Sequence, residues 1–95
     1  MDIRRYLVLG TVHITVETAH RLDAWAALAP EDRPLSVAST SYGWFVTVPE
    51  PRSGGWPMLP SDLLAAVSLA REMGCDQLLL DSDSPADAAL PTYPW

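Results

Sequence analysis

The sequence predicts an α+β fold in which two helices cover one face of a four-stranded sheet. Apolar runs with the two-residue period of a strand alternate with runs of helical period, in the order β-α-β-β-α-β. The 95 residues suffice for one domain, 1–95, with a single modest core. Because crossovers between parallel strands are right-handed, the economical arrangement is a ferredoxin-like two-layer sandwich whose antiparallel sheet has strand order 4-1-3-2.

The first strand is expected over residues 5–14 and the first helix over 16–28. Both faces of this strand are rich in apolar residues, which favours a central place in the sheet. Gly10 within it indicates a bulge or a close neighbouring segment. Thr15 is expected to cap the first turn of the helix, and Pro30 follows the end of that helix.

Two short strands at 35–40 and 44–48 are expected to form a hairpin in which Gly43 takes a positive φ angle. The segment that follows, 49–57, is rich in proline and glycine and reads as a loop.

The second helix is predicted to begin near Pro60, with Ser61 as a candidate cap, and to end at Gly74 in the left-handed conformation. The last strand, 77–81, is rich in leucine and is therefore expected in or beside the sheet centre.

The C-terminal segment, 84–95, ends on apolar and aromatic side chains, although chain ends are usually polar and frayed. In a two-layer fold the sheet face without helices would expose aliphatic side chains. We therefore expect Leu90, Tyr93 and Trp95 to pack on the sheet. If they do not, a second copy of the chain or another partner must cover that face.

Charge and composition limit the class of partner. Twelve acidic residues oppose six arginines, with no lysine, for a net charge of −6. Direct nucleic-acid binding is disfavoured, because it depends on cationic patches. The acidity either keeps the protein soluble or forms a surface that imitates nucleic acid or complements a basic partner. One cysteine, no recognisable secretory signal and no long apolar run predict a cytoplasmic protein without a membrane span.

The two histidines define an alternative, ligand-binding site. The predicted topology brings the end of the first strand near the hairpin, so that a ligand would meet a small set of polar and aromatic side chains: His13, Thr15, His20, Tyr42 and Trp44. The competing interpretation is a structural histidine hydrogen-bonded at a strand end. No third metal ligand has a recognised spacing, so neither a metal site nor a cofactor is expected.

No residue of the chain is expected to be catalytic, and we predict that the protein is not an enzyme. Cys75 follows a helix C-terminus, where the helix dipole opposes thiolate formation. Asp81 and Asp83 are interpreted either as a cation site or, preferably, as a turn in which one carboxylate binds local amides. Antiparallel pairing of the first and last strands of the sequence would place Asp81 and Asp83 beside Arg4 and Arg5 as an ion-pair clamp.

A partner-binding surface is expected from acidic and aromatic residues, because tryptophan is enriched at the centres of interfaces. The candidate residues are Glu31, Asp32, Trp44, Trp56, Asp83 and Asp87.

Four segments together resemble an uncharacterised family of small proteins carried on plasmids, integrative elements and phages. The segments are VHITVETAHRL, YGWFVTVP, LPSDLLAAVSLAREMGCDQLLLDSD and LPTYPW. The resemblance implies a mobile-element context in which antirestriction proteins are common, and it carries no catalytic residues over.

Three hypotheses follow. The first is a non-enzymatic binding protein of a mobile element or phage that inhibits a host defence complex of the CRISPR or restriction type through its acidic, aromatic-bearing surface. The alternative is a small-ligand or metal-binding domain with its site near His13, His20 and Trp44. The third is a homodimeric structural module.

Overall fold

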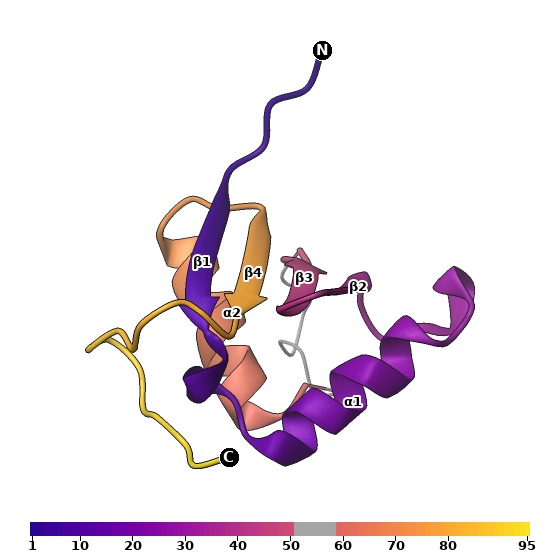
Figure 1. Cartoon of the computed structure of the whole chain (residues 1–95). Helices are drawn as coiled ribbons and strands as arrows, with labels where there is room; N and C mark the ends of the chain where they lie inside the picture. Colours follow the sequence, from indigo (N-terminus) through magenta and orange to yellow (C-terminus); the bar gives the residue numbers. More distant parts are fainter. Residues whose placement is uncertain (51–58) are drawn as a thin grey trace.

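The computed structural model describes residues 1–50 and 59–95 of the chain. The elements follow the predicted order β-α-β-β-α-β, with two additional short 3-10 helices (Figure 1). They are β1 (Tyr6–Gly10), η1 (Thr11–His13), α1 (Val16–Ala26), η2 (Pro30–Asp32), β2 (Val37–Thr40), β3 (Gly43–Thr47), α2 (Ser61–Glu72) and β4 (Gln77–Asp81).

The sheet has the strand order β1-β4-β3-β2, so the predicted antiparallel order 4-1-3-2 is wrong. β1 lies at the edge and pairs with β4 in parallel, with Tyr6 opposite Gln77 and Gly10 opposite Asp81. β4 and β3 are antiparallel, as are β3 and β2. The molecule is therefore a small α+β domain with a mixed sheet, in which β4 holds the central place expected of the first strand.

The connection between β3 and β4 explains this arrangement. The backbone N–H of Val48 donates to the carbonyl of Asp76 at 2.9 Å, so the chain leaves β3 and enters β4 at the same end of the sheet. α2 lies in this connection, and β3 and β4 are antiparallel neighbours. The prediction instead treated the connection as a crossover, which would have made these two strands parallel.

The parallel pairing also removes the predicted ion-pair clamp. Asp81 lies opposite Gly10 in the register, whereas Arg4 pairs with Asp2 at 3.0 Å. The preferred interpretation of the turn is confirmed, because Asp81 Oδ1 accepts a hydrogen bond from the Asp83 backbone N–H at 2.9 Å.

The first strand ends earlier than the predicted range of 5–14. After Gly10 the chain turns through η1, which is closed by a hydrogen bond from the Ile14 N–H to the Thr11 carbonyl at 3.1 Å. His13 closes this 3-10 turn and Ile14 follows it in extended conformation, both of them buried.

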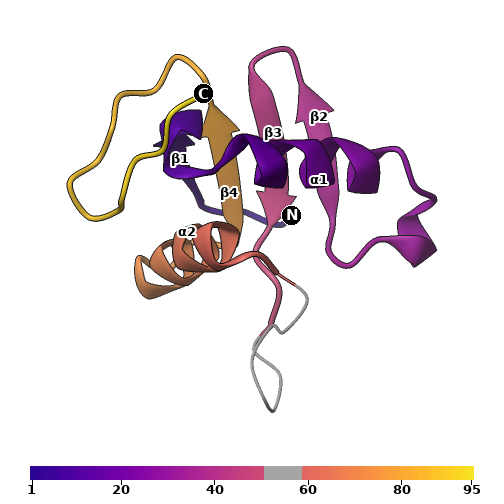
Figure 2. The ribbon, with the colours of Figure 1, turned by 90° about the horizontal axis from the view of Figure 1, so that it is seen from below.

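Both helices lie on the same side of the sheet (Figure 2). α1 contacts β2, while α2 contacts β4 and β1. The core between the layers consists of alternate strand residues and the inner helix faces: Leu9, Ile14, Ala19, Leu22, Leu35, Val37, Trp44, Val46, Leu63, Ala66, Val67, Ala70, Leu78 and Leu80.

Thr15 caps α1 as predicted, since its side chain accepts a hydrogen bond from the Thr18 N–H. Ser61 is not the cap of α2: Pro60 occupies the N-cap position and makes no side-chain cap bond. Gly74 ends α2 with a φ angle of 75°, as expected for a left-handed terminus.

The C-terminal segment, 84–95, leaves β4, crosses the end of β1 and runs to the start of α1 (Figure 1). Gly10 allows the crossing, because a Cβ atom there would lie 2.6 Å from the Ser84 carbonyl oxygen. This is the close neighbour expected at Gly10. Further along, the Tyr93 N–H donates to the Val12 carbonyl at 2.8 Å, and the Trp95 indole N–H donates to the Ile14 carbonyl at 2.9 Å.

We predict that Gly43→Ala destabilises the fold by on the order of 2–4 kcal/mol, because the added Cβ would overlap the Leu80 carbonyl of the central strand. Gly74→Ala is the matched control: its Cβ would meet only the end of the Arg5 side chain, at 3.6 Å, so the cost is about 1–2 kcal/mol from the left-handed conformation. Urea unfolding of both variants measures the difference. Equal losses would contradict the role of Gly43.

Candidate functional site

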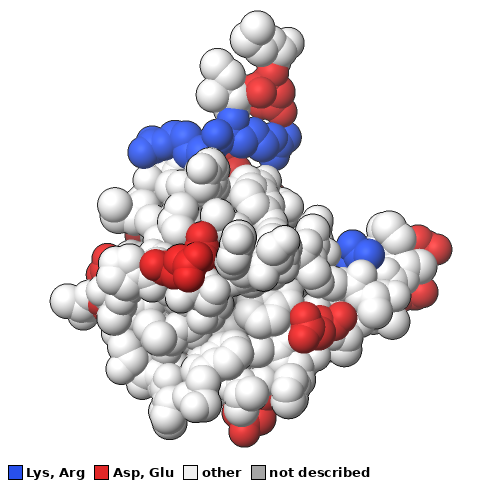
Figure 3. Space-filling view, viewed as in Figure 1, with Lys and Arg blue, Asp and Glu red and all other residues white. Residues whose placement is uncertain are grey.

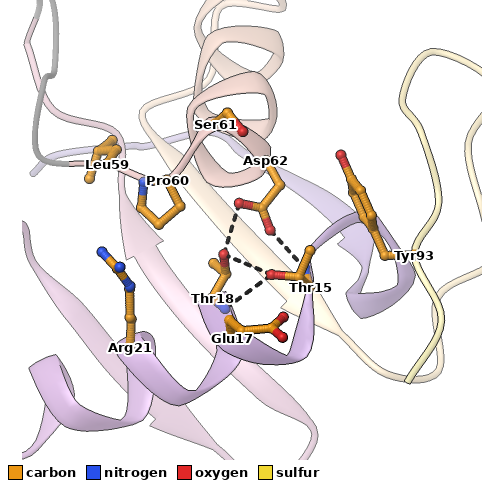
Figure 4. Close-up of a pocket in the computed structure, with 9 residues that line it drawn as sticks. All are labelled: Thr15, Glu17, Thr18, Arg21, Leu59, Pro60, Ser61, Asp62 and Tyr93. Atoms are coloured by element: carbon orange, nitrogen blue, oxygen red, sulfur yellow. Dashed lines mark hydrogen bonds between the residues drawn. The ribbon is translucent and has the colours of Figure 1, made fainter.

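A pocket of 340 Å³ lies where the N-termini of α1 and α2 meet, and we call it the helix-junction pocket (Figure 4). Its lining combines polar side chains from the first turns of both helices with Tyr93 of the C-terminal segment. The close-up shows Asp62 pointing from α2 towards the first turn of α1, where the hydrogen bonds of the junction converge.

Asp62 supplies the bonds that join the two helices. Its Oδ2 atom accepts the Thr15 backbone N–H at 2.7 Å, and its Oδ1 atom accepts the Thr18 hydroxyl at 2.8 Å. The side chain is only 7% exposed. A carboxylate near a helix N-terminus satisfies unpaired amides and is favoured by the helix dipole. Asp62 of α2 therefore extends the cap of α1.

The polar groups of this pocket that remain available are Glu17, Arg21 and the hydroxyls of Ser61 and Tyr93. Asp62 faces hydrogen-bond donors with both of its oxygens, and no histidine or cysteine lines the pocket. The junction thus has the character of a structural clamp beside a polar depression. Within residues 1–50 and 59–95, no group of three histidine, cysteine, aspartate or glutamate side chains could hold a metal ion.

The five residues of the predicted ligand site are distributed over several places. Thr15 lines the helix-junction pocket, while Tyr42 and Trp44 line a second pocket at the β2–β3 turn. His20 is exposed on α1, and His13 is buried in η1. The expected convergence required the first strand to continue to residue 14, which η1 prevents.

His13 anchors the C-terminal segment. Its Nδ1 atom lies 2.8 Å from the Pro91 carbonyl, and its Nε2 atom lies 2.8 Å from the Asp87 backbone nitrogen, which donates. A ring that accepts at Nε2 and faces a carbonyl at Nδ1 carries its proton on Nδ1. His13 is 2% exposed and so serves as the structural histidine of the competing interpretation.

The predicted acidic residues do not gather on one surface. Glu31 and Asp32 lie in η2, beyond the end of α1, whereas Asp83 and Asp87 lie in or just before the C-terminal segment on the opposite side of the molecule (Figure 1). The space-filling view shows acidic side chains as separate spots and not as one patch (Figure 3). Asp87 also binds the Ala89 N–H at 2.8 Å, which is a local turn contact.

The two predicted partner-binding tryptophans cannot be treated alike. Trp44 is 8% exposed and belongs to the core, and its indole N–H donates to Asp23 Oδ1 at 2.9 Å. Burial of the ring leaves it little surface for a partner. Trp56 lies outside the described residues.

We call the sheet face opposite the helices the open sheet face. It carries a row of apolar side chains. Val8, Leu79, Phe45 and Ala38 are register partners across all four strands. Tyr6 joins them through its ring, whose centroid lies 5.9 Å from that of Phe45. Tyr6 is 55% exposed and Val8 40% exposed. The two-residue alternation within each strand was the signal for this face, but Tyr6 and Phe45 were not among the predicted partner residues.

The fold and these surfaces define a small α+β domain with one helix-covered sheet face and one apolar face that carries no described helix. The chain belongs to DUF5983, a family of unknown function, whose C-terminal domain matches residues 6–95. No curated protein and no solved structure matches it. The resemblance to an uncharacterised family is thereby confirmed. Among the described helices, none has the length and apolarity needed to cross a membrane.

We predict that Asp62→Ala lowers the free energy of unfolding by about 2–4 kcal/mol, because the Thr15 N–H and the Thr18 hydroxyl lose their buried acceptor. Glu72→Ala, an exposed acid at the other end of α2, is the control and should change stability by less than about 0.5 kcal/mol. Urea unfolding gives both values. If Asp62→Ala and Glu72→Ala behave alike, the junction does not depend on this carboxylate.

We predict that His13→Phe loosens the C-terminal segment, because the Asp87 N–H and the Pro91 carbonyl lose their partner. Hydrogen exchange of the Tyr93 amide, which is bonded to Val12, should become at least ~10-fold faster. His20→Phe on the exposed side of α1 is the control. Unchanged exchange in His13→Phe would show that other contacts hold the segment.

Proposed function

We propose that this protein is a non-enzymatic binding module that docks on a partner protein, and that the partner is a host defence complex of the CRISPR or restriction type. The resemblance to proteins of plasmids, integrative elements and phages supports the choice of partner. The net charge of −6 supports it further, because complexes that handle nucleic acid present basic surfaces.

The open sheet face carries the proposal. Its row of Val8, Leu79, Phe45 and Ala38 spans the whole width of the sheet, and the ring of Tyr6 extends it. A contiguous apolar surface on a small protein is costly in water and typically marks an interaction site. The docking surface proposed here is therefore this face and not the dispersed acidic residues.

The chemistry of the face favours protein over nucleic acid. The apolar row contains no charged side chain, and Arg4 and Arg5 are the only basic residues that adjoin β1 in the sequence. Neutralising a phosphate backbone requires several cations along a groove. The aromatic and aliphatic row instead matches the apolar centre of a protein interface. The acidic residues at other points of the surface would speed encounter with a basic partner.

The test compares the double variant Tyr6→Thr/Val8→Thr with Val16→Thr, a control at similar exposure outside the face: Val16 is 37% exposed and Val8 40%. Threonine keeps the β-branched character that strands favour while removing apolar surface. Phage plating is measured on cells carrying a CRISPR effector or a restriction nuclease. We expect wild type and Val16→Thr to restore plating and the double variant to lose at least ~10-fold of that effect, equivalent to about 1.4 kcal/mol of binding.

Binding of the purified defence complex to the three proteins separates the two parts of the proposal. If neither kind of defence complex is bound or inhibited, the choice of partner is wrong. If the double variant binds as well as wild type, the open sheet face is not the docking surface. Light scattering provides a further check: a stable wild-type dimer that the double variant dissociates would assign the face to a second copy of the chain and overturn the proposal.

A further inference from the structure

A second pocket, of 330 Å³, lies at the β2–β3 turn, and we call it the hairpin pocket. Three aromatic side chains from distant parts of the chain line it: Tyr42 of the turn, Trp44 of β3 and Trp95 of the C-terminal segment. Among the described residues of its lining, Asp23 of α1 is the one charged side chain. The helix-junction pocket uses none of these residues.

Two of the aromatic side chains are held open to solvent. Tyr42 is 61% exposed and Trp95 is 60% exposed, although large rings normally bury most of their surface. The Trp95 indole N–H donates to the Ile14 carbonyl at 2.9 Å, which fixes one edge of the ring. A ring that is held in place and still exposed requires little ordering on binding, and this preorganisation favours a ligand.

Asp23 provides a negative charge without a matching positive one. Its Oδ1 atom accepts the Trp44 indole N–H at 2.9 Å, so the carboxylate is held in position while Oδ2 has no bond in the described part of the chain. The ion pairs found there join Arg4 to Asp2 and Arg71 to Glu50, well away from this residue in sequence. Among the described residues that line the hairpin pocket none is basic, so a cationic ligand would meet Oδ2 of Asp23 without competition from one of those side chains.

We propose that the hairpin pocket binds an organic cation, a guanidinium or alkylammonium group, against the rings of Tyr42 and Trp95 with Asp23 as its counter-ion. A cation near an aromatic face is attracted by the ring quadrupole. A nitrogen cation that reaches Oδ2 also forms a charge-assisted hydrogen bond. An anion would be repelled by Asp23, and a neutral ligand would gain neither the attraction of a cation to the rings nor the charge-assisted hydrogen bond.

The cation has two sources with the same chemistry: the side chain of an arginine on a partner protein, or a free small molecule. The first source rests on the proposed function, whereas the pocket itself does not. The pocket is built from the β2–β3 turn, α1 and the end of the chain, and the apolar row of the open sheet face lines no part of it.

The test is a titration of the full chain followed by nuclear magnetic resonance, with two probes of the same shape. N-acetyl-arginine amide carries the guanidinium, and N-acetyl-citrulline amide replaces it with a neutral urea. We expect saturable shifts of the Trp44 indole and of the amides of residues 39–44 with the arginine probe, and affinity at least ~10-fold weaker for the citrulline probe. Equal affinity for the two, or no saturable shift with the arginine probe, would overturn the proposal.

Variants assign the contacts. Asp23→Asn retains an acceptor for the Trp44 indole and should reduce arginine-probe affinity to the citrulline level, while Tyr42→Ala should weaken it about 5-fold. Asp32→Asn, an exposed acid in η2, is the control and should bind as wild type. If Asp23→Asn and Asp32→Asn bind the arginine probe equally, Asp23 is not the counter-ion and the proposal fails.

The two sources are distinguished with the defence complex of the proposed function. If excess arginine probe displaces that complex, the cation belongs to the partner; if it binds without displacing it, the ligand is a free small molecule. The double variant Tyr6→Thr/Val8→Thr should still bind the arginine probe. The failure of the open sheet face as a docking surface therefore leaves the result for the hairpin pocket intact.

Discussion

The hydrogen bonds of Asp62 are the constraint on which the rest of the molecule depends. This one carboxylate, almost fully buried at the start of α2, holds the first turn of α1 through Thr15 and Thr18. Just before Thr15 the chain passes through η1 and its C-cap residue Ile14, and both His13 of η1 and Ile14 bind the C-terminal segment. Trp95 is thereby carried to the rim of the hairpin pocket. The helix junction, the position of the C-terminal segment and the aromatic wall of that pocket form one connected arrangement.

Local signals in the sequence predicted the secondary-structure elements, but they did not predict how the strands pair. The Thr15 cap, the Gly74 terminus and the strand at 77–81 depend on neighbours within a few residues, and all three are confirmed. The sheet order depends on which of two apolar strands takes the centre. In the structure the chain enters β4 at the end at which β3 stops, and the two strands pair as antiparallel neighbours. The prediction treated the connection between them as a crossover, and no local signal in the sequence distinguishes the two paths.

The candidate sites show the same division between local and distant information. Asp62 was not among the predicted site residues, because its partners lie on another helix, far away in the sequence. Trp44 looked like an interface residue, yet alternation along β3 turns it to the helix side and leaves Phe45 on the open sheet face. The strand register and the contact between the rings of Tyr6 and Phe45 place four apolar or aromatic residues on that face: Tyr6, Val8, Phe45 and Leu79.

The edge position of β1 has a consequence for how the chain reaches its native state. β1 precedes the other three strands in the sequence, but its neighbour in the sheet is β4, with Tyr6 opposite Gln77. A nascent chain emerging from the ribosome can form the β2–β3 hairpin and α1 early, whereas the first strand waits until β4 has been synthesised. Such late closure of a long-range parallel pair is intrinsically slow. During that interval the aliphatic side chains of β1 lack the contacts with β4 and α2 that they have in the native domain.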